Sequence, residues 1–284
     1  MFTSFDQLVI PPHPSPSAIL QAGLEKLGVS YRIADTSKAE DVNAIDAWIA
    51  EKTRGEIPRI LGKPLQSASF VALNALYFKA KWQEPFDPQA TVSAPFHAVD
   101  GSAERAMLMR LAERERTYRA DKSFIGVDLP FAGERFSLTV VTSNDGKPRK
   151  LADFEPAKAW LSGDGFAPRR GDLALPRFSL ESENDLLPAL SKDLAEAAKT
   201  PTALLGFGPN AKIEGILQRT KIEVDEEGAT AAAATAVVVA RSMVADDALH
   251  MIVDKPYLFA LRDRQSGLIL VAGYVGKAPN GAAH

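Results

Sequence analysis

The sequence predicts an α+β fold, and three observations lead to this prediction. Residues 16–28 and 38–55 repeat apolar side chains at the spacing of an amphipathic helix. Residues 69–78 are apolar on both faces of a strand, which is typical of a central strand covered on both sides. Shorter segments elsewhere alternate apolar and polar residues, as half-buried strands do.

The bulk composition limits the size of the core and the class of partner. The 284 residues, 46% of them hydrophobic, suffice for one large or two small domains, and no repeat or linker separates independent domains. A net charge of −3 argues against binding of nucleic acid. No apolar run reaches the roughly 18 residues that cross a bilayer, and no signal peptide is visible, so no membrane contact is expected.

The residue types also exclude several kinds of chemistry. The chain has no cysteine, and therefore no disulfide, thiolate nucleophile or cysteine-based zinc site. Its four histidines are too scattered to suggest a metal site, and no cofactor is expected. No nucleophile elbow, zinc-protease motif, P-loop or dinucleotide motif occurs. No catalytic residue is assigned, and the protein is not expected to be an enzyme.

The chain begins with alternating strands and helices. A strand over 7–12 ends at a proline pair. The helix that follows has Ser15 as its N-cap and Pro16 at its first position, and Gly28 ends it. Residues 29–33 form the next strand.

The second helix has a clear start and a clear buried face. Ser37 and Glu40 have the spacing of a capping box. One apolar face is formed by Val42, Ile45 and Ile49.

Asn74 is the polar exception in the central strand 69–78. Because a buried amide without a hydrogen bond costs about 1–3 kcal/mol, we expect Asn74 to belong to a structural polar network. The remaining strands are expected at 91–98, 105–118, 124–131, 136–141, 172–180, 213–224, 257–261 and 268–274, and short helices at 153–162 and 185–198.

Basic and acidic residues alternate in and just after the segment 105–118. The residues are Arg110, Arg114, Arg116 and Arg119, with Glu113 and Glu115 between them. A solvated strand face explains this pattern, and a site for a heparin-like polyanion is the alternative.

The segment 224–243 differs from the rest of the chain. It opens with acids and a glycine, continues through alanines and threonines, and reaches three valines before Arg241. Alanine favours helices and valine favours strands, and no amphipathic period runs through the alanines. A small-residue helix or exposed linker is one interpretation. The other is a loop that enters a sheet as a new strand, because small uncharged side chains fit between existing strands without overpacking.

Three motifs resemble those of one family. Residues 224–235 closely resemble the reactive-loop hinge of the serpins, the serine protease inhibitor family. Residues 74–82, followed by Pro85-Phe86, look like that family's central strand and the turn after it. Residues 255–259 and 267–273 are similar to its C-terminal hairpin.

The resemblance implies a serpin fold, in which a large central mixed β-sheet, smaller barrel-like sheets and surrounding helices form a single domain over 1–284. The family's first helices have no counterpart, so the fold is expected to be N-terminally truncated, with apolar surface of 70–78 facing water. A reactive-centre loop is expected over 225–255. Its hinge consists of Glu226, Glu227, Gly228, Ala229, Thr230, Ala231, Ala232, Ala233, Ala234 and Thr235.

The resemblance also implies two places where the sheet opens. At the breach, Glu226 pairs with Arg177 and Trp82 packs beside them. At the shutter, Gln218 replaces the family's histidine and can still bridge Asn74, although it cannot titrate.

The implied function is suicide inhibition of a serine protease. The protease cleaves a bait bond and forms an acyl-enzyme, and the loop then inserts into the central sheet and carries the protease with it. Arg241-Ser242 suits a trypsin-like protease, whereas the family's usual spacing places the bond at Ser242-Met243. A monomer is implied, in an extracellular or periplasmic location.

Two alternatives remain open. One is a non-inhibitory serpin that acts as a protease substrate or binding protein, and the other is an inactive truncated serpin. Three residues also depart from the family pattern, since Asp46 stands where asparagine is usual, Ala229 where threonine or serine is usual, and Thr230 where glutamate is usual.

Overall fold

A computed structural model describes residues 2–12, 18–26, 30–65, 70–190, 196, 213–227 and 248–279. The chain divides into two compact units, Met1–Phe78 with Leu180–Ile222 and Lys79–Ser179 with Glu223–His284. Within the described ranges, no helix is long and apolar enough to cross a membrane, and no cluster of three or more histidine or acidic side chains could hold a metal ion.

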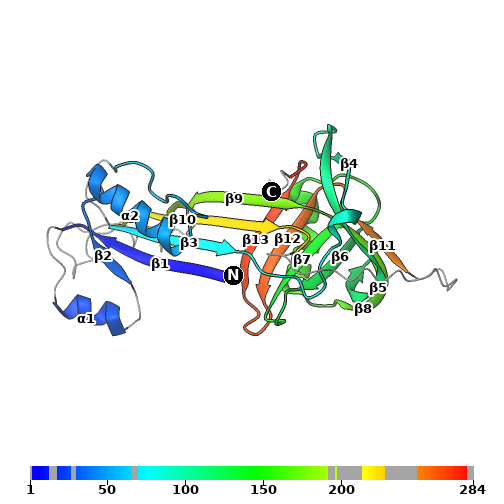
Figure 1. Ribbon diagram of the computed structural model, residues 1–284, viewed down its shortest axis with the longest axis horizontal. Helices are drawn as coiled ribbons and strands as arrows, with labels where there is room; N and C mark the ends of the chain where they lie inside the picture. The colour runs from blue at the N-terminus through cyan, green and yellow to red at the C-terminus, as the bar shows by residue number, and fades with distance from the viewer. Residues whose placement is uncertain are drawn as a thin grey trace. The chain divides into compact units, whose positions relative to one another are not determined.

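The first unit is built on a five-stranded sheet with the order β2-β1-β3-β10-β9 (Figure 1). The middle strand β3 is antiparallel to β1 and parallel to β10, which confirms the predicted central strand. Its strands are β1 (Phe2–Ile10), β2 (Tyr31–Ile33), β3 (Phe70–Phe78), β9 (Phe178–Asp185) and β10 (Ile213–Val224), and its helices are α1 (Ala18–Lys26), α2 (Ala39–Lys52) and η3 (Leu187–Ala189).

Helix α2 covers one face of β3, and α1 contacts the other face at Phe70. The predicted apolar face of α2 packs against Val71, Leu73, Ala75 and Tyr77. On the opposite face, Leu24 of α1 lies in one cluster with Phe70. Leu76 and Phe78 are only 5% and 1% exposed, so the uncovered apolar patch that we expected is not found on these residues.

The predicted capping box at the start of α2 is wrong. Lys38 occupies the N-cap position, and no side chain caps the helix there. The Ser37 hydroxyl instead donates to Asp35 Oδ1 at 2.5 Å, and the Asp35 N–H donates to Asp41 Oδ2 at 2.6 Å. Two aspartates therefore order this turn, and Glu40 has no part in it.

Asp46 anchors the segment that follows α2. Its Oδ1 accepts hydrogen bonds from the N–H groups of Ile60 and Leu61 at 2.8 and 2.9 Å, and its Oδ2 accepts one from Gly62 at 2.9 Å. Asparagine has one carbonyl oxygen and could not accept all three in this arrangement. Aspartate at position 46, where the family usually has asparagine, therefore holds this segment by three hydrogen bonds.

The second unit is built on an eight-stranded sheet with the order β11-β8-β5-β6-β7-β12-β13, and β4 pairs with β5. Its strands are β4 (Val92–His97), β5 (Ala103–Ala120), β6 (Phe124–Pro130), β7 (Phe136–Ser143), β8 (Ala167–Pro176), β11 (Leu249–Ile252), β12 (Tyr257–Asp263) and β13 (Ile269–Val275), and its 3-10 helices are η1 (Pro88–Ala90) and η2 (Leu151–Ser162).

Three segments differ from their predictions. The predicted strand 172–180 is divided at Arg177 into the end of β8 and the start of β9. The predicted helix 185–198 begins instead with the end of β9 and the short η3, and most of its second half lies outside the described residues. β11 was not predicted.

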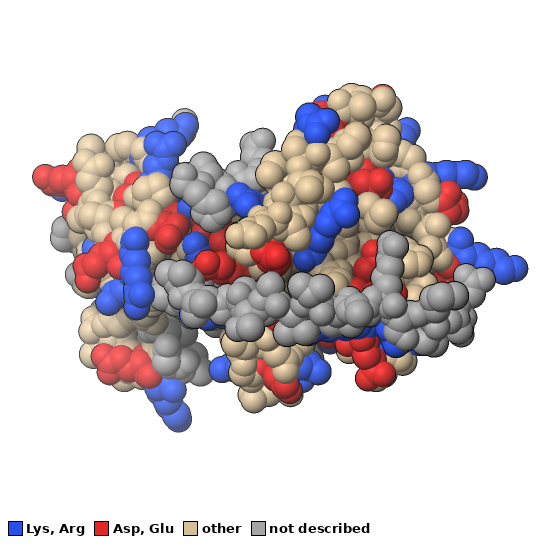
Figure 2. All heavy atoms as spheres, turned by 45° about the vertical axis from the view of Figure 1, so that its right-hand side comes forward, with Lys and Arg blue, Asp and Glu red and all other residues tan. Residues whose placement is uncertain are grey.

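Arg116 departs from the predicted solvated face. Its side chain is 6% exposed, and its Nη2 and Nε each lie 2.8 Å from an oxygen of Glu84. Its Nη1 donates to the carbonyls of Ala112 and Gly171. Basic and acidic side chains are interspersed on the face seen in Figure 2. These pairings favour a neutralised surface over a polyanion site.

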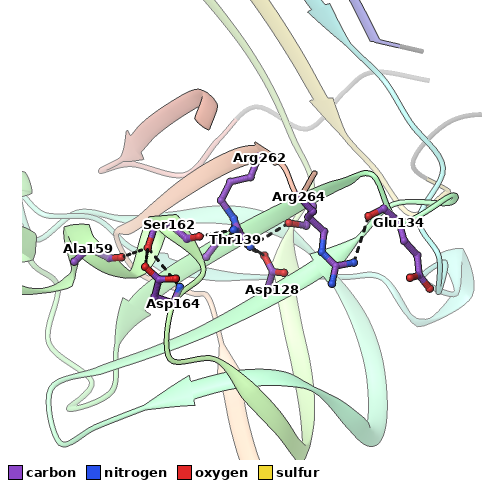
Figure 3. A network of polar contacts seen from close by, with 9 residues as sticks. Asp128, Glu134, Thr139, Ala159, Ser162, Asp164, Arg262 and Arg264 are labelled. Carbon is purple, nitrogen blue, oxygen red and sulfur yellow. Dashed lines mark hydrogen bonds and ion pairs between the residues drawn. The ribbon is translucent and has the colours of Figure 1, made fainter. Parts of the chain in front are cut away.

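A buried polar network joins β6, β7, β12 and the end of η2 (Figure 3). Arg262 donates to Asp128 Oδ1 at 3.0 Å, to the Thr139 hydroxyl at 3.1 Å and to the Ser162 carbonyl. The Thr139 hydroxyl donates to the same Asp128 oxygen at 2.7 Å. The buried charges of Arg262 and Asp128 are therefore paired with one another.

Candidate functional site

The structure describes the beginning of the predicted hinge. Glu226 and Glu227 follow the end of β10 at Val224. The rest of the hinge and the candidate bait residues lie outside the described residues: Gly228, Ala229, Thr230, Ala231, Ala232, Ala233, Ala234, Thr235, Arg241, Ser242 and Met243.

The Glu226 carboxylate is buried and receives two hydrogen bonds. Arg177 Nη2 lies 2.6 Å from Glu226 Oε1, and the two side chains are 15% and 3% exposed. The Thr91 hydroxyl donates to the same oxygen, also at 2.6 Å. A charge removed from water is costly unless it is paired and hydrogen-bonded, and both conditions hold for this carboxylate.

Trp82 fixes the backbone beside this pair. Its ring stacks on Phe131 with centroids 4.3 Å apart, and its Nε1 donates to the Asp225 carbonyl at 2.7 Å. The Phe86 N–H donates to the Glu226 carbonyl at 2.8 Å, and the Trp82 N–H donates to the Glu227 carbonyl at 3.3 Å. Residues 225–227 are thus held through three successive carbonyls.

Two opposing effects act on the pKa of Glu226. Burial raises the pKa of the carboxyl group, but the hydrogen bonds from Arg177 and Thr91 outweigh burial and leave the pKa below its usual range. The folded chain therefore favours the ionised form more than the unfolded chain does. The resulting stabilisation is present above about pH 5 and is lost as the pH falls through the folded pKa.

We expect Glu226→Gln to lower the stability of the fold at neutral pH and to make it less sensitive to acid. The difference in stability between wild type and variant should shrink as the pH is lowered from about 6 to about 3, because wild type then becomes protonated. Urea unfolding midpoints, read by circular dichroism across this range, measure the difference. A constant difference at every pH would contradict the interpretation.

A row of polar side chains crosses three strands of the first unit. Asp6 of β1 is paired in register with Asn74 of β3, which is paired with Gln218 of β10. Gln218 Nε2 donates to Asn74 Oδ1 at 2.9 Å, and Asn74 Nδ2 donates to Asp6 Oδ1 at 2.7 Å. Asn74 is half-buried and thus belongs to a polar network, as the sequence predicted.

Sequence reasoning missed two members of these clusters. Thr91 is the second donor to Glu226, and Asp6 is the acceptor that orients the Asn74 amide. Asp6 carried a weak signal, since it is an acid at the edge of a predicted apolar strand. Thr91 carried none, because the contact joins residues 135 positions apart.

Most of this sequence matches one protein family. The model of the serpin (serine protease inhibitor) family matches residues 26–277. Serpin B8 of Homo sapiens is 30% identical over 263 residues, covering 89% of this chain and 69% of that protein. Glia-derived nexin of Mus musculus is 30% identical over 251 residues, covering 82% of this chain and 62% of that protein.

A solved structure shows the same fold. The crystal structure of Serpin48, described as a highly specific serpin in the insect Tenebrio molitor, has a TM-score of 0.82 and 28% identity, covering 97% of this chain and 76% of that one. The chain spans 62–69% of the length of the two relatives above. Because the family model covers most of its residues, this chain belongs to the serpin family of serine protease inhibitors.

Proposed function

We propose that this chain inhibits a trypsin-like serine protease by cleavage of the loop after Glu227 and insertion of the cut loop between β3 and β10. The observation that supports this most directly is the parallel pairing of these two strands, from Phe70 with Ile213 to Phe78 with Ile222. A segment that turned back from the end of β10 would run antiparallel to both strands. Each of its main-chain groups would then find a partner. Insertion of a serpin reactive loop is a known example of such strand addition.

The described contacts suggest what resists insertion before cleavage. The ladder between β3 and β10 must part, and the hydrogen bond from Gln218 to Asn74 must break with it. Asn74 would keep its bond to Asp6 on the other side. At the end of β10, the contacts of Arg177 and Thr91 with Glu226 must also be exchanged. These contacts give the intact form a barrier to spontaneous insertion.

The bait is either Arg241-Ser242 or Ser242-Met243. An acidic specificity pocket pairs with arginine, so the first bond suits a trypsin-like enzyme. Titration with trypsin, analysed on a denaturing gel, is expected to give a band at the summed mass that survives boiling. Mass spectrometry of the released C-terminal fragment distinguishes a first residue of Ser242 from one of Met243.

A substitution in the hinge tests insertion separately from cleavage. Ala231→Glu places a charge in the segment that would enter the sheet, without adding a cleavage site for trypsin. We expect cleavage within about twofold of wild type and at least a tenfold loss of the boiling-resistant adduct, because an internal charge without a partner is strongly disfavoured. Ala245→Glu, downstream of both candidate bonds, is the matched control and should leave the adduct unchanged.

The outcomes separate the proposed function from its alternatives. Cleavage without any adduct in wild type would favour a substrate-like or inactive serpin over an inhibitor. An adduct that persists undiminished in Ala231→Glu would mean that trapping does not depend on insertion of this segment.

A further inference from the structure

A cavity of about 520 Å³ opens in the second unit beside Trp82. Three segments line it: the turn that contains Trp82 and Phe86, the middle of β5 from Arg114 to Thr117, and the end of β6 from Asp128 to Pro130. Its volume lies within the range of about 300–1,000 Å³ that is typical of sites for small molecules.

The topology of the sheet explains why the cavity lies here. The ladder between β5 and β6 ends at the pair Thr117 and Asp128. On the N-terminal side of Thr117, β5 pairs with β8 and no longer with β6. The two neighbouring strands therefore separate just where the lining residues stand. The turn at Trp82, which bridges to Phe131, closes the base of this fork.

The inner wall of the cavity is aromatic and aliphatic. Trp82, Phe86 and Leu129 are 4%, 1% and 5% exposed, so they contribute buried apolar surface. Trp82 and Phe86 meet edge to face with centroids 5.8 Å apart. A ligand in contact with this wall would gain mainly from burial of its own apolar surface.

The rim of the cavity carries both signs of charge, because Arg114 and Arg116 stand among Glu84, Glu115 and Asp128. Arg114 and Arg116 lie two residues apart on β5 and so point to the same side of the strand. Both arginines contact the Glu84 carboxylate. Arg116 donates to both of its oxygens, whereas Nη1 of Arg114 lies 3.4 Å from one of them. The Asp128 carboxylate, on the opposite side, is bonded to Arg262 and Thr139. Arg114 is 50% exposed and is the cation best placed to receive a ligand.

We propose that this cavity binds a small aromatic anion, with its ring against Trp82 and its carboxylate or sulfonate paired with Arg114. A guanidinium group is suited to two-pronged recognition of such oxyanions. The ligand would stabilise the arrangement in which Trp82 holds the Asp225 carbonyl, because the same side chain serves both contacts. That regulatory consequence rests on the proposed function, whereas binding itself does not.

The binding test uses a matched pair of fluorescent probes. 8-Anilinonaphthalene-1-sulfonate carries the anion, and N-phenyl-1-naphthylamine has the same rings without it. In a Trp48→Phe, Trp160→Phe background, Trp82 is the one remaining tryptophan, so energy transfer from it follows binding of the probe, and the Arg114 variant below assigns that binding to the cavity. We expect saturable binding of one sulfonate probe per chain, at least tenfold tighter than that of the neutral probe.

Charge variants then test the role of Arg114. Arg114→Gln should weaken binding of the sulfonate probe by about tenfold and leave binding of the neutral probe unchanged. Arg110→Gln, on the same strand but outside the cavity, should change neither. Equal affinity for the two probes in the original protein, or a sulfonate affinity independent of Arg114, would overturn the proposal. The comparison of the two probes needs no substitution at the rim, so it holds even if Arg114→Gln does not fold.

A second measurement tests the coupling to the hinge. The sulfonate probe is expected to slow formation of the boiling-resistant trypsin adduct by at least threefold in the original protein and to have no such effect in Arg114→Gln. If no adduct forms under any condition, the proposed inhibitory function fails. The binding titration then still shows whether the cavity binds the sulfonate probe. Binding of the probe without slower adduct formation would mean that the cavity binds the ligand but does not regulate inhibition.

Discussion

Reversal of either charge in the pair formed by Arg177 and Glu226 is expected to destabilise the uncut chain by about 3–5 kcal/mol, because each single change leaves like charges together in a buried site. The variants are Arg177→Glu and Glu226→Arg. The pair is made by atoms 2.6 Å apart, and the glutamate side chain is 3% exposed, so water cannot screen the repulsion. Urea unfolding midpoints of the intact chain measure the loss.

Reversal of both charges should recover at least about 2 kcal/mol of the summed loss, since a pair of opposite sign is restored. Recovery is expected to be incomplete, because the carboxylate oxygen that accepts from the Thr91 hydroxyl is lost and the longer arginine side chain does not place its guanidinium group at the same position. Simple additivity of the two single changes would show that the residues do not interact energetically.

A second ion pair in the same unit provides the control. Arg170 Nη2 lies 2.9 Å from Glu113 Oε1, and the two side chains are 60% and 41% exposed. An exposed pair of this kind contributes about 0–1 kcal/mol, so the corresponding cycle of reversals should give a much smaller coupling. A coupling as large as that of the buried pair would mean that depth of burial is not what makes the first pair strong.

The sequence predicted those features that depend on local pattern. The apolar face of α2 follows from the spacing of Val42, Ile45 and Ile49, and the central place of β3 follows from its apolar residues on both faces. Such patterns carry their information within one segment, because helix and strand place side chains at fixed intervals.

The features that escaped prediction depend on how distant segments meet. Asp6 meets Asn74 only because β1 and β3 pair in one particular register, and the sequence does not fix that register. The network around Arg262 requires three strands and the end of η2 to converge, although each contributing residue looks like an ordinary polar residue in an alternating strand. The capping box failed for the opposite reason, since a local motif was present but Asp35 competed for the Ser37 hydroxyl.

Gly163→Ala is expected to destabilise the chain by about 3–5 kcal/mol, which is more than the strain of the backbone alone explains. Gly163 ends η2 with a φ of 83°, a conformation that costs other residues about 1–2 kcal/mol. A Cβ atom added there would also lie 2.1 Å from Nη2 of Arg262. The guanidinium group cannot retreat cheaply, because its bonds to Asp128 and Thr139 hold it in place. If it did move, Asp128 would keep a buried charge without its partner.

Gly133→Ala separates these two causes. Gly133 has a φ of 82°, but no atom lies within 4 Å of the position its Cβ would take, so this substitution should cost only the backbone strain of about 1–2 kcal/mol. In an Arg262→Ala background, the further cost of Gly163→Ala should fall to the same value, since the clash is gone. Urea unfolding midpoints of the four variants decide the matter. If Gly163→Ala costs no more than Gly133→Ala, the packing of Arg262 against the end of η2 contributes nothing beyond the turn itself.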